Sequence, residues 1–325
     1  MLRKRWFRLT ATVVVTGLAA AYIVAKIDIR KTLDIIGSAS PWWLLLCVVL
    51  TFGTVPLQGW RWQLLLRVRG VRESVAWLVR AYFVSYAVGQ VLPTGVGGDA
   101  SRIYETTRRH PGYGSPIAGS VVLERALGGA VTLLLAGIGF LLAIGRYDIG
   151  AYLWIEALFV VLTLLAGVVV FSRRMRRYLR FSVPFLQRIK IERPIRAVYE
   201  GMHGYRDHPG TLLGVCLLTI TAQLMRIVAI WASAKAVDID LSLLPFVVLG
   251  PLLFLVMLVP FTVNGLGVRE AFFVSFLGKL GVDPDAAFAC GFLFFVMTLA
   301  LGVPGLVIIL WEGTRRREPA TVADA

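Results

Sequence analysis

The sequence predicts an all-α polytopic membrane protein with about six transmembrane helices and two opposed re-entrant helical hairpins in an inverted repeat. Of its 325 residues, 58% are hydrophobic and only 16% are charged, and the mean hydropathy is +0.76. Several uncharged runs are long enough to cross a hydrocarbon core of about 30 Å, which takes roughly 20 helical residues. The runs are continuously apolar and lack the alternation of outer-membrane β-strands, which favours helices over a barrel.

Six apolar runs have the length and composition of complete transmembrane helices. They are residues 9–25, 42–60, 117–144, 150–171, 211–235 and 286–311. Two further apolar regions, 75–92 and 243–281, do not fit a simple count of crossings.

The formal net charge of +15 indicates topology rather than a nucleic-acid partner. The basic residues lie in short segments beside apolar runs, and no recognisable nucleic-acid-binding module accompanies them. The basic segments 61–72 and 173–206 are therefore expected in the cytoplasm, and the acidic loops 236–242 and 282–285 outside. This orientation predicts a multi-pass membrane protein with cytoplasmic N- and C-termini.

Counting the crossings makes the first of the two remaining regions a re-entrant hairpin. Segments 61–72 and 173–206 share one side and are separated by two complete spans, so 93–115 must also be cytoplasmic. Region 75–92 then enters from the cytoplasm and returns there. By the same count, 243–281 enters from outside and returns outside, either as a re-entrant hairpin or as two full spans.

The tips of the two hairpins resemble each other. Four pairs coincide at a constant offset of 167 residues: Pro93/Pro260, Val96/Val263, Gly98/Gly265 and Arg102/Arg269. Upstream, Gln58-x-x-Arg61 is echoed by Gln223-x-x-Arg226. Because the tips face opposite sides, the pattern predicts an inverted repeat with broken helices at mid-depth, as in many transporters. The alternative is two ordinary Pro/Gly loops at the interfaces.

This repeat divides the chain into five parts. The predicted parts are an N-terminal span and external loop (1–41), a first half (42–144) with its tip at 93–102, a linking span and basic cytoplasmic segment (145–210), a second half (211–312) with its tip at 260–270, and a cytoplasmic tail (313–325).

Charged residues within or beside the spans are the candidate functional residues, because each costs at least about 2.5–3.5 kcal/mol at the bilayer centre. Arginine forks suit phosphate oxygens, and glycine-rich turns at helix N-termini present backbone N–H groups to anions. The headgroup-binding candidates are Arg61, Arg102, Arg125, Arg226, Arg269, Gly97, Gly98, Gly265 and Gly267. The candidates for charge balance or proton coupling are Asp99, Glu124 and Glu270. The alternative is that these charges only pair with one another to hold the fold.

No residue pattern indicates a cofactor, a metal or a catalytic group. The three cysteines (Cys47, Cys216 and Cys290) lie in apolar runs, and the histidines are scattered through polar loops. No Walker motif is present, so transport would be driven by gradients or partners.

Three motifs together resemble the lysylphosphatidylglycerol synthase transmembrane-region family. They are Leu92-Pro93-Thr94 through Gly97-Gly98-Asp99-Ala100-x-Arg102, then Leu123-Glu124-Arg125-x-x-Gly128, then Pro260 through Asn264-Gly265-x-Gly267-Val268-Arg269-Glu270. The resemblance covers about 10–312 and implies a lipid-flippase-like membrane fold in a bacterial or archaeal cell (inner) membrane. In two-part members the membrane half moves aminoacylated phosphatidylglycerol outward, and a separate cytoplasmic domain transfers the aminoacyl group from tRNA. Only 14 residues follow Trp311, so we expect neither this second domain nor an enzyme.

The leading hypothesis is therefore a flippase or transporter for an anionic lipid, either an aminoacyl-phospholipid or a polyprenyl-phosphate lipid as implied by short relatives. One alternative is an intramembrane lipid-modifying enzyme with Asp99 or Glu124 as general base. Another is a scaffold for a cell-envelope lipid synthase. The expected partners are the membrane and its anionic lipids, with a homo-oligomer or an envelope-synthesis enzyme left open.

Overall fold

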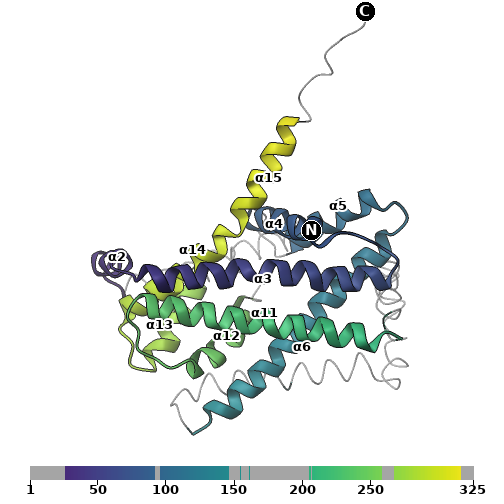
Figure 1. Ribbon diagram of the computed structural model, residues 1–325. Helices are drawn as coiled ribbons and strands as arrows, with labels where there is room; N and C mark the ends of the chain where they lie inside the picture. The colour runs from purple at the N-terminus through teal and green to yellow at the C-terminus, as the bar shows by residue number, and fades with distance from the viewer. Residues whose placement is uncertain are drawn as a thin grey trace, which may run out of the picture.

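The computed structural model describes residues 26–91, 96–145, 154, 161, 205, 207–257 and 267–315, and the secondary structure of these residues is helical (Figure 1). The helices are α2 (Ile29–Gly37), α3 (Pro41–Val68), α4 (Val75–Val91), α5 (Val96–Arg109), α6 (Gly114–Ala143), α11 (Pro209–Ala236), α12 (Leu244–Met257), α13 (Val268–Gly278), α14 (Pro284–Ala300) and α15 (Gly302–Arg315).

Four helical stretches are long and apolar enough to cross a membrane: Pro41–Val68, Gly114–Leu142, Pro209–Ala236 and Pro284–Glu312. The first has 28 residues, which at 1.5 Å per residue gives about 42 Å. These four stretches confirm the membrane class: they contain the predicted spans 42–60, 211–235 and 286–311 and cover the predicted span 117–144 as far as Leu142. The predicted spans 9–25 and 150–171 lie outside the described residues, apart from Trp154 and Val161.

Helices α3 and α11 lie side by side and antiparallel through the centre of the molecule (Figure 1). At one end, the backbone N–H of Ser40 donates to the carbonyl of Ala236 over 2.8 Å. At the other end, the Tyr205 hydroxyl donates to the carbonyl of Leu65 over 3.0 Å. Both helices begin with a proline, which suits the first helical position because that N–H has no intrahelical partner.

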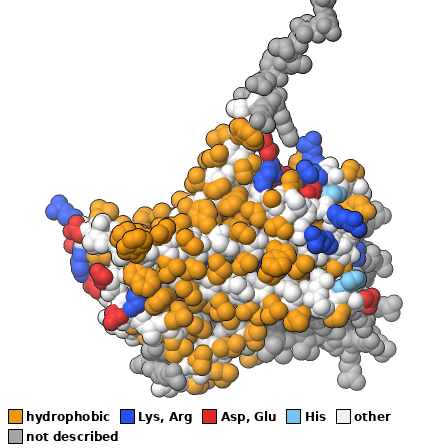
Figure 2. All heavy atoms as spheres, viewed as in Figure 1, with side chains coloured by type: hydrophobic (Ala, Val, Ile, Leu, Met, Phe, Trp, Pro, Cys, Tyr) orange, Lys and Arg blue, Asp and Glu red, His pale blue; other side chains and the backbone are white. Residues whose placement is uncertain are grey.

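Charged residues gather at the two ends of this pair, and apolar side chains cover the face between them (Figure 2). At the α2 end, Lys31 pairs with Asp283 at 2.9 Å and with Asp285 at 3.0 Å. At the opposite end, Arg80 pairs with Glu312 at 2.6 Å and with Glu105 at 3.0 Å. An apolar band between two charged ends is the surface expected of a membrane-embedded protein.

Two pairs of short helices follow the central helices. In the first half, α4 packs against α5 so closely that a Cβ on Gly98 would lie 2.5 Å from the Ser85 carbonyl oxygen. In the second half, α12 and α13 follow α11, and α12 packs against α6 near Gly139. A long helix, two short helices and a further long apolar stretch (α6, or Pro284–Glu312 across α14 and α15) thus follow one another twice, with α3 and α11 antiparallel. This arrangement is compatible with the inverted repeat, which stays a prediction together with the re-entrant hairpins.

One local prediction was wrong. Residues 61–68 belong to α3 rather than to a loop, and the buried polar partners of Arg61 allow the helix to continue. Gly97 and Gly98 lie in the first turn of α5, at a helix N-terminus as expected, and their contact with an anion stays a prediction. The stretch that contains the predicted span 286–311 has a break at Leu301, where Pro304 lacks the N–H that a continuous helix would need. Gln90 compensates at this break, because its amide nitrogen donates to the carbonyl of Leu299 over 2.9 Å.

Candidate functional site

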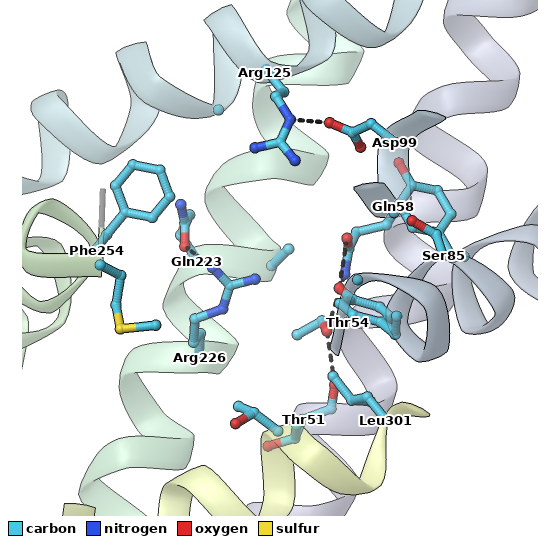
Figure 3. Close-up of a pocket in the computed structure, with 18 of the residues that line it drawn as sticks. Thr51, Thr54, Gln58, Ser85, Asp99, Arg125, Gln223, Arg226, Phe254 and Leu301 are labelled. Atoms are coloured by element: carbon cyan, nitrogen blue, oxygen red, sulfur yellow. Dashed lines mark hydrogen bonds and ion pairs between the residues drawn. The ribbon is translucent and has the colours of Figure 1, made fainter. Parts of the chain in front are cut away.

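A cavity of about 620 Å³ lies between the helices, and Figure 3 shows side chains from both halves pointing toward it. Polar side chains of α3, α4, α5, α6 and α11 line one part of its wall. The remainder is largely apolar and includes Phe254, Met257, Phe294, Phe295, Leu299 and Leu301. The cavity is therefore amphipathic, with a polar wall and an apolar wall.

Glu124 is the centre of the polar wall. It lies in the apolar helix α6, and its side chain is only 3% exposed. One carboxylate oxygen accepts from Nη2 of Arg61 and from the Tyr82 hydroxyl. The other oxygen accepts from Nη1 of Arg102 over 2.7 Å. Three helices, α3, α4 and α5, are thus tied to α6 through one buried carboxylate.

Arg102 connects Glu124 to a second carboxylate. Its Nε and Nη2 donate to Oδ1 of Asp99 over 3.0 and 2.9 Å. The guanidinium carbon lies 4.7 Å from the ring centroids of both Trp62 and Tyr82, within the range of cation–π attraction. The second oxygen of Asp99 pairs with Arg125. The result is one network, here called the Glu124 network, made of Arg61, Glu124, Arg102, Asp99 and Arg125.

The second tip holds a smaller ion pair. Arg269 and Glu270 are each 4% exposed and pair through Nη2 at 2.6 Å. The other Glu270 oxygen accepts from the backbone N–H of Gly267 over 2.7 Å, which caps the start of α13. Gly267 has a φ of 79°, a left-handed conformation that glycine adopts without a Cβ penalty. Arg269 lines the cavity and stacks 4.1 Å from the Phe295 ring centroid.

Arg226 differs from the other cavity arginines. It lies past the midpoint of α11, and Figure 3 shows its guanidinium group directed into the cavity. Its Nη1 donates to the amide oxygen of Gln223 over 3.2 Å, and Gln223 in turn donates to the Thr132 hydroxyl over 2.8 Å. No carboxylate among the described residues pairs with Arg226. It is a cation at membrane depth with only neutral hydrogen-bond partners there.

The charges that line the cavity do not balance. Five arginines (Arg61, Arg102, Arg125, Arg226 and Arg269) line the cavity with two carboxylates (Asp99 and Glu124), and Glu270 neutralises Arg269 from beside it, which leaves a formal surplus of two positive charges among these described residues. Uncompensated charge is costly in a low-dielectric interior unless a counter-charge or water reaches it. The arrangement therefore favours an anion in the cavity.

The structure brings most of the predicted site residues to this single cavity. Arg61, Arg102, Arg125, Arg226, Arg269, Gly98, Asp99 and Glu124 all line it. Glu270 instead pairs with Arg269, Gly97 lies within α5, and Gly267 caps α13. Gly265 lies outside the described residues.

Two residues that contact the Glu124 network, Tyr82 and Trp62, were not among the predicted site residues. Tyr82 was hidden in an apolar run, where nothing in the sequence separates it from an ordinary core aromatic. Trp62 lies past the end of the predicted span 42–60, but it is buried in α3 and its indole nitrogen donates to the Ser120 hydroxyl over 2.9 Å. The repeated Gln-x-x-Arg pattern did carry a signal, because Gln58 and Gln223 both line the cavity beside Arg61 and Arg226.

The described residues contain no group of three or more His, Cys, Asp and Glu side chains that could hold a metal ion.

Comparison with known proteins supports the membrane fold. The chain is 27% identical over 337 aligned residues to "Glycosyltransferase AglD" of Haloferax volcanii, an alignment that covers 91% of this chain and 53% of the relative. The chain thus spans about half the length of this curated relative. The family model described as "Lysylphosphatidylglycerol synthase TM region" matches residues 9–305. The chain therefore belongs to the lysylphosphatidylglycerol synthase transmembrane-region family.

Proposed function

We propose that this protein binds an anionic lipid in the central cavity and moves its headgroup across the membrane. The observation that carries the proposal is the surplus of two positive charges among the described residues of an amphipathic cavity between helices long enough to span a membrane. Family membership and the relative named as a glycosyltransferase both support work on lipids or glycolipids.

The two parts of the cavity wall suit the two parts of such a lipid. Guanidinium groups bind phosphate oxygens through charge-assisted hydrogen bonds, and the apolar residues of α12 and α14 suit hydrocarbon. A volume of about 620 Å³ is in the usual range of ligand sites, roughly 300–1,000 Å³. That volume accommodates a headgroup with the first part of its chains.

The arrangement of the halves supports movement of the headgroup rather than binding alone. The antiparallel helices α3 and α11 each present a Gln-x-x-Arg segment to the cavity, Gln58 with Arg61 and Gln223 with Arg226. In transporters with inverted repeats, rocking of one half against the other exposes a fixed central site to each side in turn. The same motion would present the arginines here to each leaflet.

A second candidate function is covalent modification of a lipid, which the printed name of the Haloferax volcanii relative favours. Asp99 or Glu124 would then act as the general base. Each oxygen of these carboxylates already accepts a hydrogen bond from an arginine. Neither carboxylate could take a proton from a substrate without first losing a partner, so we favour transport without chemistry.

The test is reconstitution of the purified full chain into liposomes that contain fluorescent lipids. A membrane-impermeant quencher reports how fast labelled phosphatidylglycerol leaves the inner leaflet. We expect faster exchange than in protein-free liposomes and a loss of most of this gain with Arg226→Gln. The matched control is Arg30→Gln, which removes the same charge from an exposed site on α2 and should leave exchange unchanged. Equal exchange with and without protein for every anionic lipid would contradict the proposal.

A further inference from the structure

A row of neutral polar side chains lines the cavity near the middle of α3. Thr51, Thr54 and Gln58 are each more than nine-tenths buried, and all three line the cavity (Figure 3). Their spacing of three and four residues places them on one face of the helix. These three residues are here called the α3 ledge. The ledge lies at the middle of a helix long enough to span a membrane, so its polar atoms need partners other than bulk water.

Hydrogen bonds between side chains satisfy only part of the α3 ledge. The Tyr86 hydroxyl donates to the amide oxygen of Gln58 over 3.0 Å. The amide nitrogen of Gln58 donates to the Thr54 hydroxyl oxygen over 3.3 Å, and Thr54 donates to the backbone carbonyl of Thr51 over 2.7 Å. Among the described residues, the second amide N–H of Gln58 and the lone pairs of the Tyr86 oxygen have no partner in this chain of bonds.

The Thr51 hydroxyl is the most informative member of the α3 ledge. A threonine inside a helix can bond to a carbonyl one turn back, as Thr54 and Thr219 do. The Thr51 hydroxyl oxygen is buried and makes no hydrogen bond of normal geometry to any described residue. The Cys47 thiol interacts with it but is a weak hydrogen-bond partner. Because a buried hydroxyl without a partner is costly, we expect the occupant of the cavity to supply one.

Hydroxyl groups match what these side chains leave free. The Thr51 hydroxyl and the Gln58 amide offer donors, and the Thr51 and Tyr86 oxygens offer acceptors. An ionised phosphate only accepts, whereas an alcohol both donates and accepts. Arg61 follows Gln58 on the same face of α3, about 4.5 Å further along the helix axis, and also lines the cavity. A headgroup whose phosphate binds Arg61 would therefore place its neighbouring hydroxyls at the ledge.

We infer that the α3 ledge binds hydroxyl groups of the lipid headgroup, so that the cavity prefers phosphate lipids with a polyol or sugar headgroup over phosphate lipids without headgroup hydroxyls. This inference rests on the proposed function, because it names the cargo class of the same cavity. The selectivity resides in neutral side chains. The positive charge of the cavity attracts both classes alike.

The test is competitive binding of two matched lipids to the purified full chain, measured by native mass spectrometry from neutral detergent. Phosphatidylglycerol and phosphatidylethanol have the same chains, the same phosphodiester and the same single negative charge, but only the first has headgroup hydroxyls. Phosphatidylcholine serves as the reference. We expect phosphatidylglycerol to bind at least about fivefold more tightly than phosphatidylethanol, the factor expected for about one net hydrogen bond.

Two variants assign the preference to the α3 ledge. Thr51→Val keeps the backbone carbonyl that Thr54 uses and removes only the hydroxyl. It should lower the binding of phosphatidylglycerol toward that of phosphatidylethanol and leave the latter unchanged, which reports in the same measurement that the variant is folded. Gln58→Met removes the amide and should act in the same direction. The control is Thr221→Val, which removes a hydroxyl from an exposed position on α11 and should change neither.

The outcomes separate the two proposals. If phosphatidylglycerol and phosphatidylethanol bind equally and more tightly than phosphatidylcholine, the role of the ledge is refuted and the anionic-lipid site survives. If neither binds better than phosphatidylcholine, the proposed function fails, and the inference fails with it. A preference that persists in both Thr51→Val and Gln58→Met, or that Thr221→Val reduces equally, would place the selectivity elsewhere and overturn the inference.

Discussion

Replacing Glu124 by glutamine tests whether the Glu124 network holds the fold. The substitution keeps the shape of the side chain but removes the charge shared by Arg61 and Arg102. Both arginines would keep a buried cation without that counter-charge, and Arg102 would retain only Asp99 as an acidic partner. Breaking a buried ion pair by removing one partner costs about 3–5 kcal/mol. Since many proteins are stable by only about 5–15 kcal/mol, we expect a large loss of stability.

The buried cysteines offer a direct assay. Cys47 and Cys290 are both 0% exposed, so a thiol-reactive dye should report unfolding of the detergent-solubilised protein as temperature rises. We expect Glu124→Gln to unfold many degrees below the parent protein. The matched control is Asp240→Asn, which removes a carboxylate that pairs with Lys235 while 99% exposed, and it should unfold close to the parent.

A double substitution completes the test. Arg61→Gln together with Glu124→Gln removes both members of one pair and should recover part of the loss, because one fewer cation is left unpaired. If Glu124→Gln were as stable as Asp240→Asn, the network would not support the fold. Glu124 would then be a better candidate for coupling or chemistry than for structure.

Two further predictions concern packing and topology. A Cβ on Gly305 would lie 1.9 Å from the Phe83 carbonyl oxygen, so Gly305→Ala should separate α15 from α4 and lower the unfolding temperature in the dye assay. The control is Gly137→Ala, whose Cβ meets nothing within 4 Å, and it should be neutral or stabilising. The charge pattern predicts that Glu105 is cytoplasmic and that Asp240 is outside. In a background without reactive cysteines, an impermeant thiol reagent added to intact cells should therefore label Asp240→Cys and not Glu105→Cys. Labelling of residue 105 from outside would refute the first hairpin and the inverted repeat.

The membrane helices could be predicted because a long apolar run indicates directly that a segment lies in hydrocarbon rather than in water. The central parts of α3, α6 and α11 fall inside the predicted apolar runs. The ends were harder, because helix ends depend on tertiary partners. Arg61 marked an apparent end of its span, but its pairing with Glu124 allows α3 to continue to Val68. The break at Leu301 likewise depends on Gln90, a residue far away in the sequence.

The site was predictable in part for a different reason. Charge inside an apolar run is rare and costly, which singled out Glu124, Arg226 and their neighbours before any contact was known. The sequence could not show which arginine pairs with which carboxylate, because the pairs join helices far apart along the chain. Nor could it show that Arg269 pairs with Glu270, whereas Arg226 has no carboxylate partner among the described residues.

This difference between Arg61 on α3 and Arg226 on α11 accounts for one of the surplus positive charges at the cavity. Arg61 and Arg226 occupy equivalent positions in the two Gln-x-x-Arg segments, and both line the cavity. Arg61 finds Glu124 on α6, the last long helix of the first half. The corresponding helices of the second half, α14 and α15, contain no Asp or Glu between Asp285 and Glu312. The arginine is thus present in both segments, but its carboxylate partner is present only for Arg61. Arg61 is paired by the protein, and Arg226 is available to a ligand. If the two halves do alternate around this cavity, the bound anion supplies the missing counter-charge. The positive surplus then exists only while no anion is bound.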